Sequence, residues 1–194
     1  LTLPNIVNAF PFTKENCTNY KYSSSQLFKN KVNSVVLVTT SESQGSGFVV
    51  KQEKSNTYIL TNAHVVGNKK RVDIKWSDEE KSSGEVIGNL GGYELSKDLA
   101  LIKVPERKGK PLKLIDKNPE IGSDAVVIGS PSGPEFSLTR GVVSQVREKG
   151  DFVQIDAPVN PGNSGGPVFN HAGCVIGIVT FKAGDSSEGL NFAI

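Results

Sequence analysis

The sequence predicts an all-β protein made of two antiparallel six-stranded β-barrels packed side by side. Short runs rich in Val, Ile and Leu follow one another along most of the chain, and several alternate apolar with polar residues, as a half-buried strand does. Clusters of Gly, Ser, Asn and Asp separate these runs and are typical of turns. The polar stretch Glu106–Pro111 divides the runs into two groups of about six, which favours one barrel on each side of it.

The first barrel is expected to span residues 31–107, after an N-terminal arm over residues 1–30. Ser24–Val35 is the only segment that hints at a helix, because no other segment keeps a helical period of apolar residues. The short runs that we expect to form the strands of this barrel are 34–40, 47–50, 57–61, 71–76, 84–88 and 98–104.

The second barrel is expected to span residues 108–194. The Lys- and Arg-containing stretch at its start is interpreted as a solvated linker rather than a binding patch, because charge runs usually form solvated surface. The runs that we expect to form strands after the linker are 111–115, 124–129, 137–146, 152–156, 166–170, 174–181 and 190–194.

The composition excludes several classes of function. The 194 residues include 22 basic and 20 acidic side chains, and this net charge of +2 provides little field for nucleic acid or an anionic membrane. No apolar run approaches the ~20 residues of a membrane span. Two histidines and two cysteines show no zinc spacing, so we expect neither a metal nor a cofactor. Cys17 and Cys174 can form one disulfide or remain two free thiols, and their positions do not decide between these alternatives.

Three segments carry side chains suited to nucleophilic catalysis. Ser164 stands among the three glycines of Pro161–Pro167, which permit the tight turn and close substrate approach that a nucleophilic serine needs. Asp98 stands at the start of an alternating strand, where a buried carboxylate can orient a histidine. His64 follows a predicted strand, whereas the other histidine, His171, lies in a polar turn and is interpreted as a solvated residue. Each segment alone also fits an ordinary turn or surface position, so the hypothesis depends on their combination.

In the order His, Asp, Ser, these segments resemble the motifs of trypsin-like serine proteases, and most closely those of the HtrA/Deg branch. The resemblance rests on Thr61–Val66, Asp98–Val104 and Asn160–Val168, and it covers residues 28–194. It implies a chymotrypsin-like double barrel with His64 and Asp98 on the first barrel and Ser164 on the second.

The resemblance also implies roles for individual residues. His64 would take the hydroxyl proton of Ser164, while Asp98 would hold the histidine in the required tautomer. The backbone N–H groups of Gly162 and Ser164 would bind the oxyanion. Asn163 stands where zymogens of the wider family carry a carboxylate, so we expect loop order rather than a buried N-terminal amine to shape the site.

Substrate-binding residues are implied by a second part of the resemblance. Val179, Thr180 and Phe181 are similar to the strand that pairs with extended substrate and forms one wall of the primary specificity pocket. Pro158 and Val159 would lie at the base of that pocket. No Asp occupies the base, and the histidine typical of glutamyl endopeptidases is absent, so we expect an apolar pocket for small or medium aliphatic side chains.

The sequence therefore predicts a serine endopeptidase that acts on unfolded or extended protein, with a latent or inactive protease-fold binding module as the alternative. Because the chain starts without Met, we expect a processed, exported product: periplasmic, lumenal or secreted. It stops at Ile194, so we expect no PDZ domain in this chain. Proteases of the branch form homotrimers through N-terminal aromatic residues, and packing of the arm on its own barrel is the equal alternative. The aromatic residues that could serve here are Phe10, Phe12, Tyr20 and Tyr22.

Overall fold

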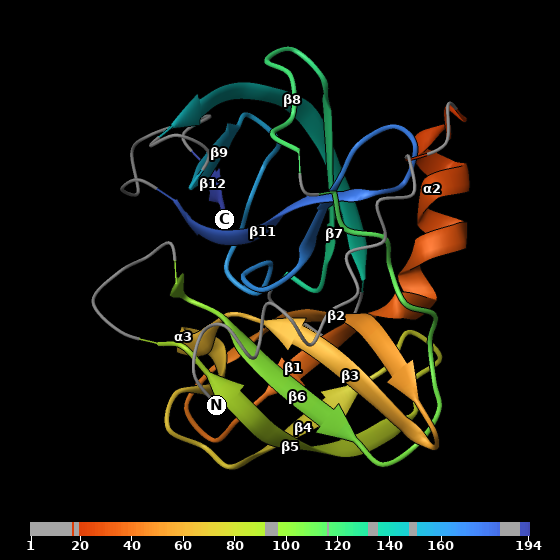
Figure 1. Cartoon of the computed structure of the whole chain (residues 1–194), viewed down its shortest axis with the longest axis vertical. Helices are drawn as coiled ribbons and strands as arrows, with labels where there is room; N and C mark the ends of the chain where they lie inside the picture. The colour runs from red at the N-terminus through yellow and green to blue at the C-terminus, as the bar shows by residue number, and fades with distance from the viewer. Residues whose placement is uncertain are drawn as a thin grey trace.

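The computed structural model consists of two closed antiparallel β-barrels of six strands each, which confirms the predicted fold class (Figure 1). The barrels lie one above the other in Figure 1, and the chain completes the lower barrel before it enters the upper one. The residues that the structure describes are 17, 20–91, 97–115, 117–131, 136–147, 151–182 and 191–194, with only the backbone described at 181 and 182.

The first barrel closes because its first strand pairs with both the second and the fourth. Its strand order is β1-β2-β3-β6-β5-β4. Inward-facing aliphatic residues fill it around Trp76, which is 1% exposed. The strands are β1 (Val35–Thr39), β2 (Gln44–Glu53), β3 (Asn56–Thr61), β4 (Arg71–Lys75), β5 (Lys81–Asn89) and β6 (Ala100–Val104).

The second barrel repeats the same topology, with the order β7-β8-β9-β12-β11-β10 closed between β10 and β7. Its interior is a separate cluster of small aliphatic side chains, mostly Val and Ala. The strands are β7 (Asp124–Gly129), β8 (Ser137–Arg147), β9 (Phe152–Ile155), β10 (Pro167–Phe169), β11 (Val175–Lys182) and β12 (Asn191–Ala193).

The segment predicted as a strand at 111–115 is wrong as a strand: it makes one isolated parallel bridge, Leu114 to Val175. It crosses from one barrel to the other, so its backbone bonds are divided between them. Leu112 N–H donates to Val49 O at 2.9 Å on the first barrel, and Ile115 N–H donates to Val175 O at 3.0 Å on the second. A connecting segment of this kind has the apolar composition of a strand because it covers the boundary between the barrels.

The polar stretch before this crossing is partly fixed on the first barrel rather than fully solvated. The Thr57 hydroxyl donates to Glu106 O at 2.8 Å, and the Gln52 amide donates to Gly109 O at 2.9 Å. Lys108 Nζ pairs with Asp78 and lies 5.6 Å from the centre of the Trp76 ring. The interpretation of 106–111 as a plain solvated linker is therefore only partly right.

The helix anticipated within Ser24–Val35 is present as α2 (Ser24–Lys31), which continues into a short 3₁₀ turn, η1 (Val32–Ser34). Ser23 and Gln26 form a capping box that satisfies N–H groups at the start of α2. Leu27 of α2 is 1% exposed and belongs to a core cluster that includes residues of both barrels. The helix thus forms part of the packing between the barrels.

Cys17 and Cys174 form a disulfide, with their Cα atoms 6.3 Å apart. This decides between the two alternatives that the sequence left open. The disulfide attaches the N-terminal arm to the turn before β11, and Tyr22 N–H donates to His171 O at 2.9 Å beside it. Of the arm's aromatic residues, Tyr22 packs against the shared core, Tyr20 is 51% exposed, and Phe10 and Phe12 lie outside the described residues.

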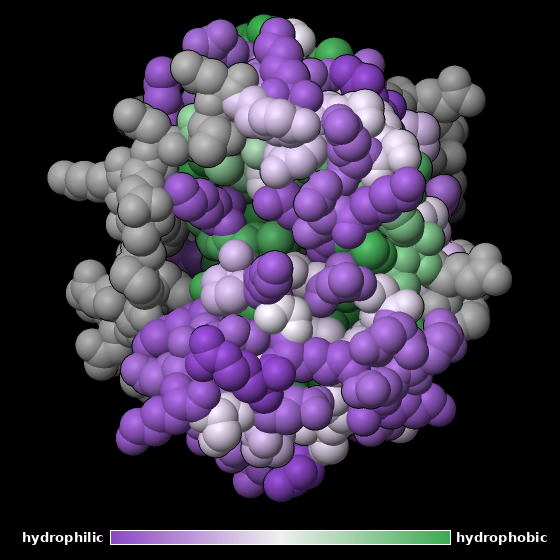
Figure 2. Space-filling view, turned by 90° about the vertical axis from the view of Figure 1, so that its right-hand side faces the viewer, coloured by the Kyte–Doolittle hydropathy of each residue, from purple (hydrophilic) through white to green (hydrophobic). Residues whose placement is uncertain are grey.

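Polar residues cover most of the face shown in Figure 2, and the apolar residues visible there gather mainly in the band between the two barrels. Apolar packing across that band is consistent with the shared cluster, which joins Phe48 and Leu60 of the first barrel to Ile128 and Phe169 of the second. Burying this surface holds the two barrels in a fixed relation, so residues from both can form one site.

Candidate active site

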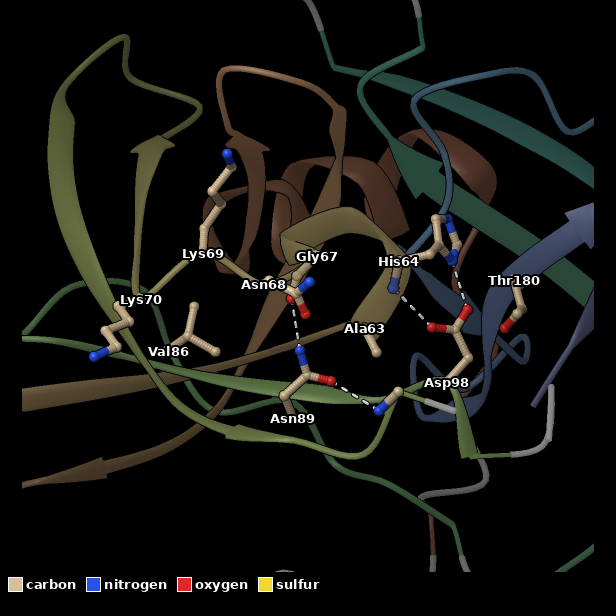
Figure 3. Close-up of a pocket in the computed structure, with 11 residues that line it drawn as sticks. Ala63, His64, Gly67, Asn68, Lys69, Lys70, Val86, Asn89, Asp98 and Thr180 are labelled. Carbon is tan, nitrogen blue, oxygen red and sulfur yellow. Dashed lines mark hydrogen bonds and ion pairs between the residues drawn. The ribbon is translucent and has the colours of Figure 1, made fainter. Parts of the chain in front are cut away.

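His64 and Asp98 meet at the end of the first barrel that faces the second. His64 lies on α3 (Ala63–Val66), a single helical turn directly after β3. Its backbone N–H donates to Asp98 Oδ1 at 2.8 Å, and its ring Nδ1 lies 2.5 Å from Asp98 Oδ2 (Figure 3). Both carboxylate oxygens of Asp98 therefore hold the same histidine.

This arrangement decides which ring nitrogen carries the proton. An ionised carboxylate only accepts hydrogen bonds, so Nδ1 must donate, and Nε2 of a neutral His64 is then an acceptor. The His64 side chain is 49% exposed, whereas that of Asp98 is 11% exposed. The pair thus presents a basic nitrogen to solvent while its carboxylate stays shielded.

Asn62 supports the pair from behind and connects it to the second barrel. The Asn62 side chain is fully buried, and its amide N–H group donates to Asp98 O at 2.8 Å and to Thr180 Oγ1 at 3.3 Å. The Thr180 hydroxyl in turn donates to Ile178 O at 2.9 Å. Asn62 lies within the motif Thr61–Val66, but this role could not be predicted from the sequence, because its partners are 36 and 118 residues away.

Ser164 lies on the loop between β9 and β10, at the edge of the second barrel. Gly162 and Gly165 on this loop have φ angles of +98° and +83°, which favour glycine. The Ser164 hydroxyl makes a long 3.5 Å contact to Thr180 O, and no hydrogen bond joins it to His64 within the described structure. The structure thus brings the three candidate residues to one region and leaves the serine and histidine side chains unbonded.

Over residues 162–166 of the serine loop, three backbone N–H groups are bonded to described residues and two are not. Asn163 N–H donates to Asn160 O at 3.0 Å, Gly165 N–H to Val179 O at 2.8 Å and Gly166 N–H to Asn163 O at 2.9 Å. Among the described residues, the N–H groups of Gly162 and Ser164 have no acceptor. Two free N–H groups on either side of Asn163 are thus available to an external acceptor.

A groove of about 850 Å³ opens beside the histidine. Figure 3 shows Asp98 and Thr180 at the His64 end and Lys70 and Val86 at the opposite end. Asn89 joins two segments of the groove wall: its side-chain amide donates to Gly67 O at 2.8 Å and accepts from Gly91 N–H at 2.7 Å. The lining residues are Ala63, His64, Gly67, Asn68, Lys69, Lys70, Val86, Asn89, Gly91, Asp98 and Thr180.

The residues expected to bind substrate occupy different environments. Val179 is fully buried, and its N–H and C=O are both bonded to the serine loop, at Gly166 O and Gly165 N–H. Thr180 is 3% exposed and lies at the groove beside His64. Pro158 is exposed, Val159 packs against the core of the second barrel, and only the backbone of Phe181 is described. The backbone of Val179 therefore supports the serine loop.

Within the described residues, no three His, Cys, Asp or Glu side chains are grouped so that they could hold a metal ion. No helix among the residues that the structure describes is long and apolar enough to span a membrane.

Paired six-stranded barrels with a His–Asp pair beside a glycine-flanked serine are the architecture of a trypsin-like peptidase domain. The family model described as a trypsin-like peptidase domain matches residues 45–178, and the chain belongs to this family. Within the family, its relatives assign it to the HtrA/Deg branch, as the sequence motifs predict.

The chain is 33% identical over 202 residues to a "Serine protease HtrA-like" of Staphylococcus haemolyticus, covering 94% of this chain and 30% of that protein. It is 38% identical over 166 residues to a "Probable periplasmic serine endoprotease DegP-like" of Ectopseudomonas mendocina, covering 79% and 33%. The crystal structure of the serine endoprotease from Yersinia pestis superimposes with a TM-score of 0.75 at 29% identity, covering 91% of this chain and 63% of that one. The chain thus spans about a third of the length of these curated relatives.

Proposed function

We propose that this chain is the protease domain of an HtrA-type serine endopeptidase and that Ser164, His64 and Asp98 hydrolyse peptide bonds. The observation that carries the proposal is the pair of hydrogen bonds between His64 and Asp98, at 2.8 Å from the backbone N–H and 2.5 Å from the ring. This hold leaves Nε2 as the free basic nitrogen. The serine loop, with the unbonded N–H groups of Gly162 and Ser164, lies across the boundary between the two barrels from this pair.

In the proposed reaction, Ser164 Oγ attacks the carbonyl carbon of the scissile bond while His64 Nε2 takes the hydroxyl proton. The negative charge that develops on the carbonyl oxygen is held by the N–H groups of Gly162 and Ser164, each worth about 3–4 kcal/mol. The C–N bond then breaks, and the leaving amine takes the proton from His64. A water molecule, deprotonated by His64, hydrolyses the acyl-enzyme by the same route. Asp98 remains ionised and orients the ring throughout.

The unbonded Ser164 hydroxyl is compatible with this reaction. Its 3.5 Å contact to Thr180 O is at the limit of a hydrogen bond, so releasing it costs little. Catalytic hydrogen bonds are often long before substrate binds and tighten in the complex. The same feature favours the alternative function, a latent or inactive binding module, if the pair does not form when substrate is present.

We propose unfolded or extended protein as the substrate, with an aliphatic residue before the scissile bond. Val159 supports an apolar pocket, because it packs against the aliphatic core of the second barrel. A peptide-library digest in which basic or acidic residues dominate before the cleaved bond would contradict this preference.

We also propose that the protein is exported. A relative is named a periplasmic endoprotease, and the disulfide between Cys17 and Cys174 is typical of an oxidising compartment.

We also propose a homotrimer formed through the N-terminal arm. Tyr20 supports this proposal, because it is an aromatic residue of the arm that is 51% exposed and so is accessible to another subunit. Light scattering of the purified protein should give three times the chain mass of 20.8 kDa. A monomer at micromolar concentration would overturn the trimer without affecting the catalytic proposal.

A fluorophosphonate probe, which reacts covalently with activated serines, tests the central proposal. We expect the wild-type protein to be labelled and Ser164→Ala to remain unlabelled. His171→Ala is the matched control, because His171 lies in a turn away from the groove and should leave labelling unchanged. Labelling that persists in Ser164→Ala would refute Ser164 as the nucleophile. Absence of labelling in the wild type, with the fold intact, would favour the binding module.

A further inference from the structure

A buried serine on the first barrel is bonded directly to the serine loop of the second. Ser46 lies on β2 between two glycines and is fully buried. Its backbone N–H donates to Ser164 O at 2.7 Å, and its hydroxyl donates to Gly162 O at 2.7 Å. Ser46 thus contacts the loop at the two residues whose N–H groups are free.

The direction of the Ser46 hydroxyl is determined by its partners. Ser130 N–H donates to Ser46 Oγ at 3.0 Å, and an N–H group can only donate. The carbonyl oxygen of Gly162 can only accept, so the hydroxyl hydrogen must point at Gly162. Since Ser130 follows β7, one hydroxyl bonds two separate segments of the second barrel.

These bonds determine how the peptide planes of the loop are turned. The Gly162 carbonyl is held by the Ser46 hydroxyl, while the N–H on the other side of that peptide donates to Asn160 O. The Ser164 carbonyl is held by the Ser46 N–H in the same way. If either peptide turned over, a carbonyl oxygen would leave its donor, and a buried carbonyl without a donor is costly. The free N–H groups of Gly162 and Ser164 belong to the preceding peptides, each of which shares a Cα atom with a peptide that Ser46 holds. Ser46 therefore restrains the orientation of both N–H groups through these shared Cα positions.

Gly45 and Gly165 leave room for this close contact. A Cβ atom on Gly45 would lie 2.9 Å from Ser164 O, and a Cβ on Gly165 would lie 2.2 Å from Ser46 O. Both segments therefore need a residue without a Cβ atom at these positions for the direct hydrogen bonds to form. The Thr61 hydroxyl also donates to Ser46 O at 2.7 Å, so the same residue is tied to the strand that leads into α3 and His64.

We propose that Ser46 is a positioning residue that holds the serine loop in its oxyanion-binding conformation from the opposite barrel. This inference rests on the proposed function, because it assigns Ser46 a part in the same reaction. Ser46 touches neither substrate nor the reacting atoms. It acts through Gly162 and Ser164, and its loss should lower the rate of the chemical step while leaving substrate binding nearly unchanged.

The test compares Ser46→Ala with Ser34→Ala. Ser34 is a matched control, because it is 3% exposed and its hydroxyl accepts from Lys110 N–H at 3.1 Å, outside the site. With fluorescent β-casein as substrate, we expect Ser46→Ala to lower kcat about 10- to 100-fold with KM unchanged, and the fluorophosphonate labelling rate to fall by a similar factor. Ser46→Cys keeps the shape and a weaker donor, so its rates should lie between those of Ser46→Ala and the wild type.

A second measurement does not depend on activity. Amide hydrogen exchange of a peptide fragment covering 160–168 should be faster in Ser46→Ala than in the wild type and unchanged in Ser34→Ala. If wild-type protein is not labelled, the proposed function fails, and hydrogen exchange alone still decides whether Ser46 holds the loop. Unchanged exchange, labelling within twofold of the wild type, or an equal loss in Ser34→Ala would each overturn the inference.

Discussion

Asp98 holds His64 by two separate bonds, one from each carboxylate oxygen, to the backbone N–H at 2.8 Å and to ring Nδ1 at 2.5 Å. The first bond fixes where the single turn of α3 begins relative to β6. The second fixes the ring and its tautomer. Because one residue performs both functions, the position of the histidine and its protonation pattern depend on the same side chain.

Asp98→Asn should therefore lower kcat by about 10⁴-fold, because an amide N–H facing Nδ1 favours the wrong tautomer. The matched control is Asp156→Asn, since Asp156 also accepts a backbone N–H, from Val142 at 2.6 Å, but on the second barrel. β-Casein hydrolysis by both variants measures the effect. Comparable losses in the two variants would show that a backbone bond to any aspartate, rather than the hold on His64, explains the result.

Gly165→Ala should unfold the protein at markedly lower urea concentration than the wild type. Gly165 has a φ of +83°, and an added Cβ would lie 2.2 Å from Ser46 O and 2.3 Å from Thr61 Oγ1. Gly122→Ala separates the two causes, because Gly122 has a φ of +84° and open space around it. We expect about 1 kcal/mol of destabilisation at Gly122 from backbone strain alone, and several kcal/mol at Gly165 from strain and overlap together. An equal loss of unfolding free energy in the two variants would mean that the structure around Ser46 moves to accept the added Cβ atom at no cost.

Removal of the disulfide with Cys17→Ser and Cys174→Ser should lower the free energy of unfolding by about 2–4 kcal/mol. The two cysteines are 157 residues apart, so the cross-link restricts a large part of the unfolded chain. Urea unfolding with and without dithiothreitol provides the measurement. The reductant should shift the wild type and leave the double variant where it is, and a wild type insensitive to full reduction would contradict the expectation.

Asp78→Asn should change stability in a pH-dependent way. The hydrogen bond from Lys108 lowers the pKa of Asp78 below its ordinary value of 3.8. Burial lowers the pKa of Lys108, but its bonds to Asp78 and Glu80 outweigh burial and raise it above 10.5. Because the pKa of Asp78 is lower in the folded than in the unfolded state, its contribution to the free energy of unfolding is present at neutral pH. That contribution is lost as the pH falls from the unfolded-state pKa through the folded-state pKa.

We expect the free energy of unfolding of the wild type to exceed that of Asp78→Asn by less than about 1 kcal/mol at pH 7, since the Asp78 side chain is 52% exposed, and the difference to vanish in strong acid. High salt should reduce it as well. Urea unfolding across this pH range measures it, with Asp73→Asn as the control on an exposed position of β4. A difference that grows on acidification would have the wrong sign for this mechanism.

Sequence patterns predicted the fold closely because strands have local signals. Alternation and turn residues are properties of a few neighbouring positions, and they located the twelve strands that the two barrels contain. The error at 111–115 has a physical cause: a crossing segment that covers the boundary between the barrels is as apolar as a strand. Apolar content alone does not distinguish the two.

Order along the chain and a few local motifs were enough for the sequence to determine the two-barrel class and to point to His64, Asp98 and Ser164. The tertiary structure decided what depends on distant partners. It paired Cys17 with Cys174, left the Ser164 hydroxyl unbonded to His64, and joined Ser46 to Gly162 across 116 residues. Such contacts leave no periodic or local pattern, because only the packing of one barrel on the other brings the two chain segments together.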